Sequence, residues 1–128
     1  MRIIGHGIDM VETARIARLL EEHGPRFLRR CYTEQEQSYA ADKRRHLEHL
    51  AGRFAVKEAV FKALGAGWSG GVTWTDIEVQ RLATGQPQLV IQGHSAELAR
   101  QLGVTQWLVS ITHTVDCAMA SVIAVGDG

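Results

Sequence analysis

One long helical segment constrains the fold of this 128-residue chain more than any other feature. Residues 44–64 contain no proline, and they are followed by Gly65, a residue type that readily takes the left-handed conformation of a helix C-cap. At 100° per residue, one stripe roughly 100° wide collects Leu47, Leu50, Ala51, Phe54, Phe61 and Gly65. A long helix with such a stripe is expected to pack that face against another element.

The segments around this helix predict an α+β fold. Residues 2–10 suit a strand, a helical pattern follows over 12–22, and Thr33 with Glu36 forms a capping box that begins a short helix. The second half predicts strands at 72–81, 88–91, 107–113 and 117–125, with a helix capped by Ser95 that ends at Gly103. Because helices come mainly first and strands later, we expect helices packed on a mostly antiparallel sheet, in a single domain over 1–128.

Charge and composition narrow the classes of function. The 14 Lys and Arg balance the 14 Asp and Glu, which argues against a strongly basic nucleic-acid binder. The balance is uneven along the chain: residues 1–62 carry 12 basic against 9 acidic residues, and residues 63–128 carry 2 against 5. A basic N-terminal half predicts either an acidic partner or an ordinary solvated face.

Nothing in the sequence predicts a membrane or an oxidising compartment. The longest apolar run covers residues 117–125, which is too short to span a bilayer as a helix, and the N-terminal residues lack the apolar region of a signal peptide. Cys31 and Cys117 lie far apart without CxxC spacing. We therefore expect a cytoplasmic protein with reduced thiols.

A carboxylate lies where the long helix should be apolar. Glu58 follows Phe54 by four residues and precedes Phe61 by three, so it falls inside the predicted stripe. Ionised carboxylates are seldom buried unless they are paired or bind a metal. Either Glu58 belongs to a metal or substrate site, or it forms a simple i,i+4 ion pair with Lys62.

Asp9 ends a mostly apolar strand in which two glycines, Gly5 and Gly7, would let another backbone or a ligand come close. It could also cap the helix that follows. Together with Glu58, Lys62 and the glycine-rich loop 65–71, it resembles a magnesium–phosphate constellation, because Mg²⁺ takes one or two carboxylates and completes its shell with water and phosphate oxygens. His113 shares a strand face with apolar residues, so it is either a core histidine or a phosphate- or base-binding group.

Four segments in order resemble the bacterial holo-(acyl-carrier-protein) synthases of the phosphopantetheinyl transferase family. The opening segment is Gly7-Ile8-Asp9-Met10-Val11-Glu12, and the most specific one is Leu50-Ala51-Gly52-Arg53-Phe54-Ala55-Val56-Lys57-Glu58-Ala59 with Lys62 and Gly65-Ala66-Gly67. Residues 74–79 with 85–87 resemble the family's middle hairpin, and Ser110-Ile111-Thr112-His113 its C-terminal signature. Thr112 and Thr114 stand where the family often has serine and glutamate.

The resemblance implies a reaction and a site. The enzyme would transfer phosphopantetheine from coenzyme A to a serine of apo acyl carrier protein, for fatty acid biosynthesis, and release adenosine 3′,5′-bisphosphate. Asp9 and Glu58 would bind Mg²⁺ and Lys62 would approach the phosphates, with Glu58 or a metal-bound water as the base. Gly65 and Gly67 would border the nucleotide, whose adenosine end would contact Ser110 and His113.

The resemblance also implies partners. The acidic carrier protein would dock on Arg15 and Arg18, and the chain would form a homotrimer with sites at subunit interfaces, His113 coming from the neighbouring subunit. No nucleic-acid or membrane partner is expected. The alternatives are a non-catalytic module that binds coenzyme A or a nucleotide, and a magnesium phosphohydrolase that needs no carrier protein.

Overall fold

The computed structural model describes residues 1–41, 44–65 and 72–127. Its strands are β1 (Arg2–Glu12), β2 (Ile77–Arg81), β3 (Pro87–Ile91), β4 (Val104–His113) and β5 (Cys117–Gly126). Its helices are α1 (Thr13–His23), α2 (Pro25–Cys31), α3 (Glu34–Ala41), α4 (His46–Leu64) and α5 (Gly93–Leu102), with a 3₁₀ turn, η1 (Trp74–Asp76). In the described part of the chain, no helix is long and apolar enough to cross a membrane.

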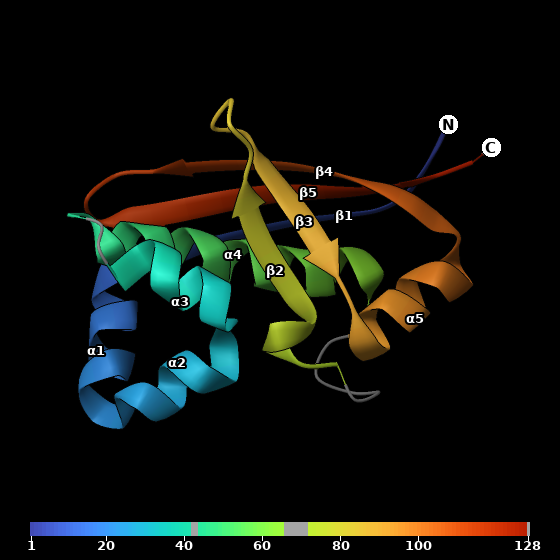
Figure 1. The fold of residues 1–128 in the computed structure, drawn as a ribbon. Coiled ribbons are helices and arrows are strands. Elements are labelled where there is room, and N and C mark those ends of the chain that lie inside the picture. The colour runs from blue at the N-terminus through green and yellow to red at the C-terminus, as the bar shows by residue number, and fades with distance from the viewer. Residues whose placement is uncertain (42–43, 66–71, 128) are drawn as a thin grey trace.

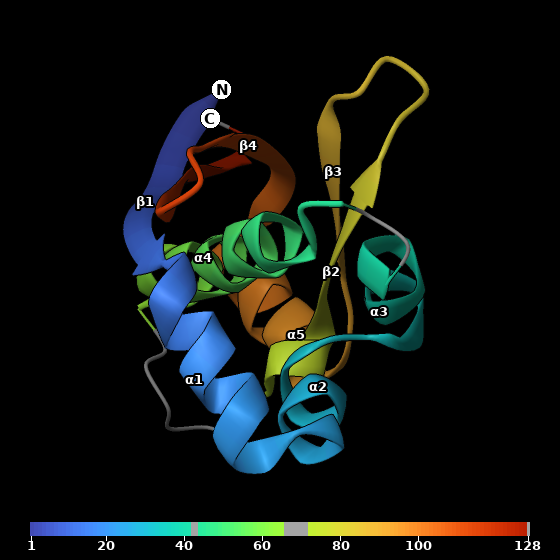
Figure 2. The ribbon, with the colours of Figure 1, turned by 90° about the vertical axis from the view of Figure 1, so that its left-hand side faces the viewer.

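The strands form two antiparallel sheets. Three long strands pair in the order β1–β5–β4, and β2 pairs with β3 as a separate hairpin. Figure 1 shows α4 lying along one face of the three-stranded sheet, and Figure 2 shows α1 and α2 next to each other below α4. The predicted α+β fold, with helices on antiparallel strands, is confirmed.

Two glycines of β1 let α4 approach the sheet closely. A Cβ atom on Gly5 would lie 2.0 Å from the carbonyl oxygen of Ala63, and one on Gly7 would lie 1.9 Å from that of Ala59. Any side chain at either position would overlap the helix backbone. The prediction that these glycines admit another backbone is confirmed, and the backbone is that of α4.

Helix α4 is buried on nearly all sides, so the expectation of a single apolar stripe is wrong. The sheet covers one side of α4, while α1, α3 and β2 pack on the others. Its buried residues include Arg53, which is 2% exposed, and Lys57, which is fully buried. A central helix with charged residues inside must supply partners for them, because an unpaired buried charge is strongly destabilising.

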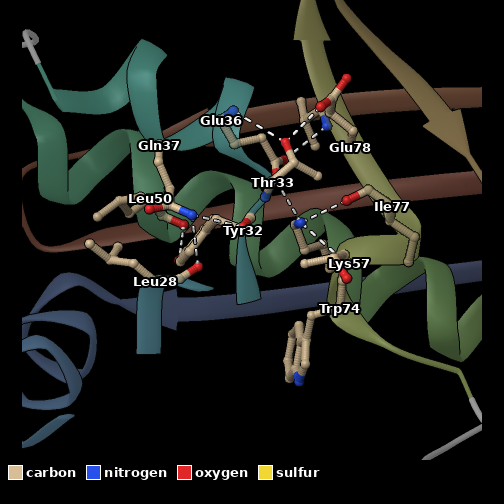
Figure 3. A network of polar contacts seen from close by, with 12 residues as sticks. Leu28, Tyr32, Thr33, Glu36, Gln37, Leu50, Lys57, Trp74, Ile77 and Glu78 are labelled. Atoms are coloured by element: carbon tan, nitrogen blue, oxygen red, sulfur yellow. Dashed lines mark hydrogen bonds and ion pairs between the residues drawn. The ribbon is translucent and has the colours of Figure 1, made fainter. Parts of the chain in front are cut away.

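The partner of Lys57 comes from the predicted capping box (Figure 3). The Thr33 backbone N–H donates to Glu36 Oε1 and the Glu36 N–H donates to Thr33 Oγ1, which confirms the box. Glu36 is itself buried: its Oε1 accepts from Lys57 Nζ at 2.6 Å and its Oε2 from the Val79 N–H at 2.9 Å. Lys57 also donates to the carbonyls of Trp74 and Ile77, so one buried ion pair ties α3, α4, η1 and β2 together.

Two local predictions differ from the structure. Residues 72–76 are not strand, because Thr73 and Asp76 form a second capping box that begins η1. Ser95 does not cap α5, whose N-cap is Gln92. Instead the Ser95 N–H and hydroxyl both donate to Asp76 Oδ2, so a side chain from η1 occupies the helix start.

Candidate active site

Asp9 and Lys62 meet at one edge of the three-stranded sheet. Lys62 Nζ lies 3.1 Å from Asp9 Oδ1 and donates to the Ile8 carbonyl at 2.9 Å. The Asp9 side chain is 19% exposed and that of Lys62 is 54% exposed, so the pair faces solvent. The alternative interpretation of Asp9 as a helix cap is wrong, because α1 has Glu12 as its N-cap and no side-chain capping bond.

Glu58 lies beside this pair and is half-buried. Burial raises the pKa of Glu58, the nearby Asp9 carboxylate raises it further, and the Arg15 and Lys62 cations lower it. Within the described residues, Lys62 forms its ion pair with Asp9 and not with Glu58, so the simple i,i+4 pair is not formed. The structure therefore brings Asp9, Glu58 and Lys62 together from β1 and α4, as the sequence predicted.

The donor set suits a hard divalent cation. In the described part of the chain, no group of three or more His, Cys, Asp and Glu residues could hold a metal ion. Two neighbouring carboxylates are nevertheless a fitting set for Mg²⁺, which keeps several waters and takes further oxygens from a phosphate ligand. Burial is the main cause of the raised pKa of Glu58 and repulsion by the Asp9 carboxylate adds to it; such a cation would relieve that repulsion.

A basic groove with a cavity volume of about 390 Å³ opens near Glu58, since Arg15, whose cation lowers the pKa of Glu58, is one of its lining residues. Its floor is aromatic: Phe54 packs against Trp74 with ring centroids 4.4 Å apart, and Phe27 lies beside Phe54 at 6.3 Å. The Arg15 guanidinium lies 5.2 Å from the centre of the Phe54 ring. The remaining lining residues are Leu19, His23, Arg26, Arg30 and Cys31. The sequence predicted a role for Arg15 but not the aromatic floor, although Phe54 lies one turn from Glu58 in the predicted stripe.

The two arginines predicted to dock a partner are separated in this region. Arg15 lines the groove, whereas Arg18 is exposed on α1 and is not part of the lining. Both belong to the same helix and lie one turn apart. Helix α1 therefore carries one arginine that lines the groove and one that is exposed outside it.

The remaining predicted residues lie elsewhere in the chain. His113 faces α4, and its Nδ1 is 2.7 Å from Glu48 Oε1, while Ser110 is exposed on the opposite face of β4. Glu48 and Glu58 are separated by about 15 Å along α4, at 1.5 Å per residue. Strand β5 lies between Asp9 on β1 and His113 on β4, which adds about 10 Å across the sheet. One chain therefore does not bring His113 to Asp9 and Glu58.

The glycine predictions are met in part. Gly65 ends α4 in the left-handed conformation, with φ 69° and ψ 18°, so the predicted C-cap is confirmed. It follows Lys62 by three residues, at the same end of the helix as the ion pair with Asp9. Gly67 lies outside the described residues.

A family model described as the 4'-phosphopantetheinyl transferase superfamily matches residues 5–119. The chain belongs to this superfamily. Two phosphopantetheinyl transferases with high similarity are both called holo-[acyl-carrier-protein] synthase. The one from Solibacter usitatus is 46% identical and the one from Koribacter versatilis 47% identical, each over 121 residues that cover 94% of this chain and 97% of the relative.

Solved structures of phosphopantetheinyl transferases share the fold. The holo-[acyl-carrier-protein] synthase of Neisseria meningitidis superposes with a TM-score of 0.89 at 31% identity, over 97% of this chain and 99% of that chain. The synthase of Bacillus anthracis, solved in complex with CoA (3′,5′-ADP), gives a TM-score of 0.80 at 34% identity over 98% of both chains. The family resemblance drawn from the sequence motifs is thus confirmed, and the protein is an enzyme of the phosphopantetheinyl transferase type.

Proposed function

We propose that this enzyme transfers 4′-phosphopantetheine from coenzyme A to a serine hydroxyl of an acidic apo acyl carrier protein, and releases adenosine 3′,5′-bisphosphate. The observation that carries this proposal is the convergence of Asp9, Glu58 and Lys62 beside a basic groove. Relatives named holo-[acyl-carrier-protein] synthase and a neighbour solved with CoA support the choice of both substrates. The carrier of fatty acid biosynthesis is the expected acceptor, and the cytoplasm the expected location.

Asp9 and Glu58 would hold Mg²⁺ against the pyrophosphate of coenzyme A. When bound, the cation would supply positive charge that stabilises the charge developing on the phosphoryl oxygens. The half-burial of Glu58 raises its pKa, so its carboxylate is a stronger acceptor for a cation or for a proton than an exposed one.

Lys62 would contribute a compact positive charge to the reacting phosphates. Its ammonium already lies at the edge of the carboxylate pair, held by Asp9 and by the Ile8 carbonyl. Attack of the serine oxygen on phosphorus spreads negative charge over the phosphoryl oxygens and the leaving phosphate, and preorganised cations stabilise that charge best. Gly65 and Gly67 would border the phosphates at the end of α4.

The carrier protein would dock on the basic surface formed by α1 and the groove. Arg15 and Arg18 would form ion pairs with acidic groups of the carrier, and Arg26 and Arg30 extend the basic surface along the groove. The phosphopantetheine chain would extend between this surface and the carboxylates. The packed rings of Phe54 and Trp74 would give its apolar part a surface to pack against. Because such pairing is screened by salt, the KM for the carrier should rise with ionic strength.

The enzyme would act as a homotrimer with its sites at subunit interfaces. The face of the three-stranded sheet opposite α4 exposes large apolar side chains, with Ile8 52%, Met10 63%, Leu108 44% and Met119 37% exposed. Contiguous exposed apolar side chains of this kind are typical of an interface. Such contacts would bring the end of β4 of one subunit, which carries Ser110 on the interface face and His113 at its last residue, to the nucleotide bound beside Asp9 of its neighbour, with His113 at the ribose phosphate.

Incubation with coenzyme A, Mg²⁺ and verified apo carrier protein, followed by mass spectrometry of the carrier, tests the proposal. We expect a phosphopantetheine adduct with the wild-type enzyme and strong loss of transfer in D9A, E58A and K62A. The matched control is E97Q, which removes one charge from an exposed ion pair on α5, far from the groove in sequence, and should transfer normally. Binding of coenzyme A without an adduct would favour a non-catalytic binding module, and phosphate release without carrier protein a phosphohydrolase.

A further inference from the structure

The imidazole of His113 is held by a buried carboxylate. His113 Nδ1 lies 2.7 Å from Glu48 Oε1, and the Glu48 side chain is only 7% exposed. Arg45 Nε lies 3.7 Å from the other carboxylate oxygen, Oε2. Because an ionised carboxylate accepts hydrogen bonds and cannot donate them, Nδ1 of His113 carries the proton in this contact.

This contact leaves the other ring nitrogen for a ligand. The His113 side chain is 28% exposed, so part of the ring reaches solvent while Nδ1 faces Glu48. The neighbouring titratable groups are on the helices: His49 of α4 lies 6.3 Å from His113 between ring centroids, and Tyr39 of α3 lies 5.4 Å from His49. Nε2 is thus the ring nitrogen left for a solvent-borne anion, to which it donates a hydrogen bond when the ring is an imidazolium with both nitrogens protonated.

We propose that Glu48 is a positioning residue, which orients His113 so that Nε2 faces the 3′-phosphate of coenzyme A. The inference rests on the proposed function, in which His113 binds the ribose phosphate. Glu48 is built on the long central helix, and His113 on β4, so both partners stand on rigid elements. A ring fixed before binding loses little rotational freedom when the ligand arrives, and this strengthens binding. Glu48 would therefore act on donor affinity and not on the chemical step.

Two donor substrates, coenzyme A and dephospho-coenzyme A, distinguish a positioning role of Glu48 from a purely structural one. Dephospho-coenzyme A lacks the 3′-phosphate that His113 would contact, so the effect of Glu48 should vanish with it. We expect E48A to raise the KM for coenzyme A about tenfold, the usual size of a lost charge-assisted hydrogen bond, with kcat within about twofold. The KM for dephospho-coenzyme A should stay within about twofold of the wild type. E48Q, which keeps an acceptor oxygen but loses the charge, should raise the KM for coenzyme A by a smaller factor, about threefold.

A second pair of variants covers the case in which E48A folds poorly. If Glu48 acts only through His113, E48Q should have no further effect on the KM for coenzyme A in an H113A background. Equal rises in KM for both donors, or an added effect of E48Q on top of H113A, would overturn the positioning role. Absence of transfer by the wild type from either donor would instead overturn the proposed function itself. E97Q serves as the unperturbed control.

Discussion

Replacement of Lys57 by methionine tests the buried network that ties four elements together. Lys57 and Glu36 are both fully buried, and Lys57 Nζ makes three contacts, with Glu36 Oε1 at 2.6 Å, the Ile77 carbonyl at 2.6 Å and the Trp74 carbonyl at 3.1 Å. Burial lowers the pKa of Lys57, and the Glu36 carboxylate opposes that shift. K57M keeps the apolar length of the side chain but leaves the Glu36 charge without its cation.

Loss of one member of a buried ion pair costs about 3–5 kcal/mol, because the remaining charge is uncompensated. For a domain of this size we expect K57M to lower Tm by about 10–20 °C. Neutralising Glu36 should remove much of this loss of stability. K57M should therefore lower the free energy of unfolding by about 1–3 kcal/mol less in an E36Q background than in the wild type. Urea unfolding of the four proteins, followed by circular dichroism, gives the free energies of unfolding.

Two outcomes would refute this reasoning. A loss of less than about 1 kcal/mol in K57M would mean that the Glu36 charge finds another partner or reaches water. Strict additivity of K57M and E36Q would mean that the two side chains are not coupled, contrary to their contact in Figure 3.

Three further predictions concern packing, the thiol and the metal. G7A should destabilise the protein by about 1–3 kcal/mol in urea unfolding, because the new Cβ would overlap the Ala59 carbonyl oxygen; an unchanged midpoint would contradict the close contact of β1 with α4. Burial raises the pKa of Cys31 to about 11, so iodoacetamide should alkylate it in a C117S variant at a rate that climbs toward pH 11; a plateau near pH 9 would contradict this. EDTA should abolish transfer and Mg²⁺ restore it, and full activity in EDTA would argue against the metal role of Asp9.

The sequence predicted the features that are determined by residues close together in the chain. The capping box at Thr33, the left-handed cap at Gly65 and the glycines of β1 are each specified within a few residues, and each is found in the structure. The approach of Asp9 to Lys62 was predicted because the resemblance covers both segments. Helix α2 was not predicted, although Pro25 is well placed to begin a helix.

Features that depend on distant partners could not be predicted. Periodicity suggested one apolar stripe on α4, yet Lys57 is buried because Glu36 lies against it, and Glu36 also binds the backbone of Val79, 43 residues away. The groove likewise needs Trp74 to pack on Phe54, two residues from different elements. No local pattern specifies such long-range pairing. The sequence therefore pointed to the polar residues of the candidate site but not to the aromatic residues that line the groove.

In the proposed trimer, Asp9 and Glu58 come from one subunit and His113 from its neighbour. Co-expression of D9A with H113A chains, purified through separate tags as mixed oligomers, tests it most directly. In every mixed closed trimer, one of the three sites pairs an intact Asp9 with a neighbour's intact His113. With coenzyme A below its KM, where the loss of His113 lowers the rate, we predict transfer at about a third of the wild-type rate, well above either parent alone. Activity no greater than the mean of the two parents would contradict the shared site.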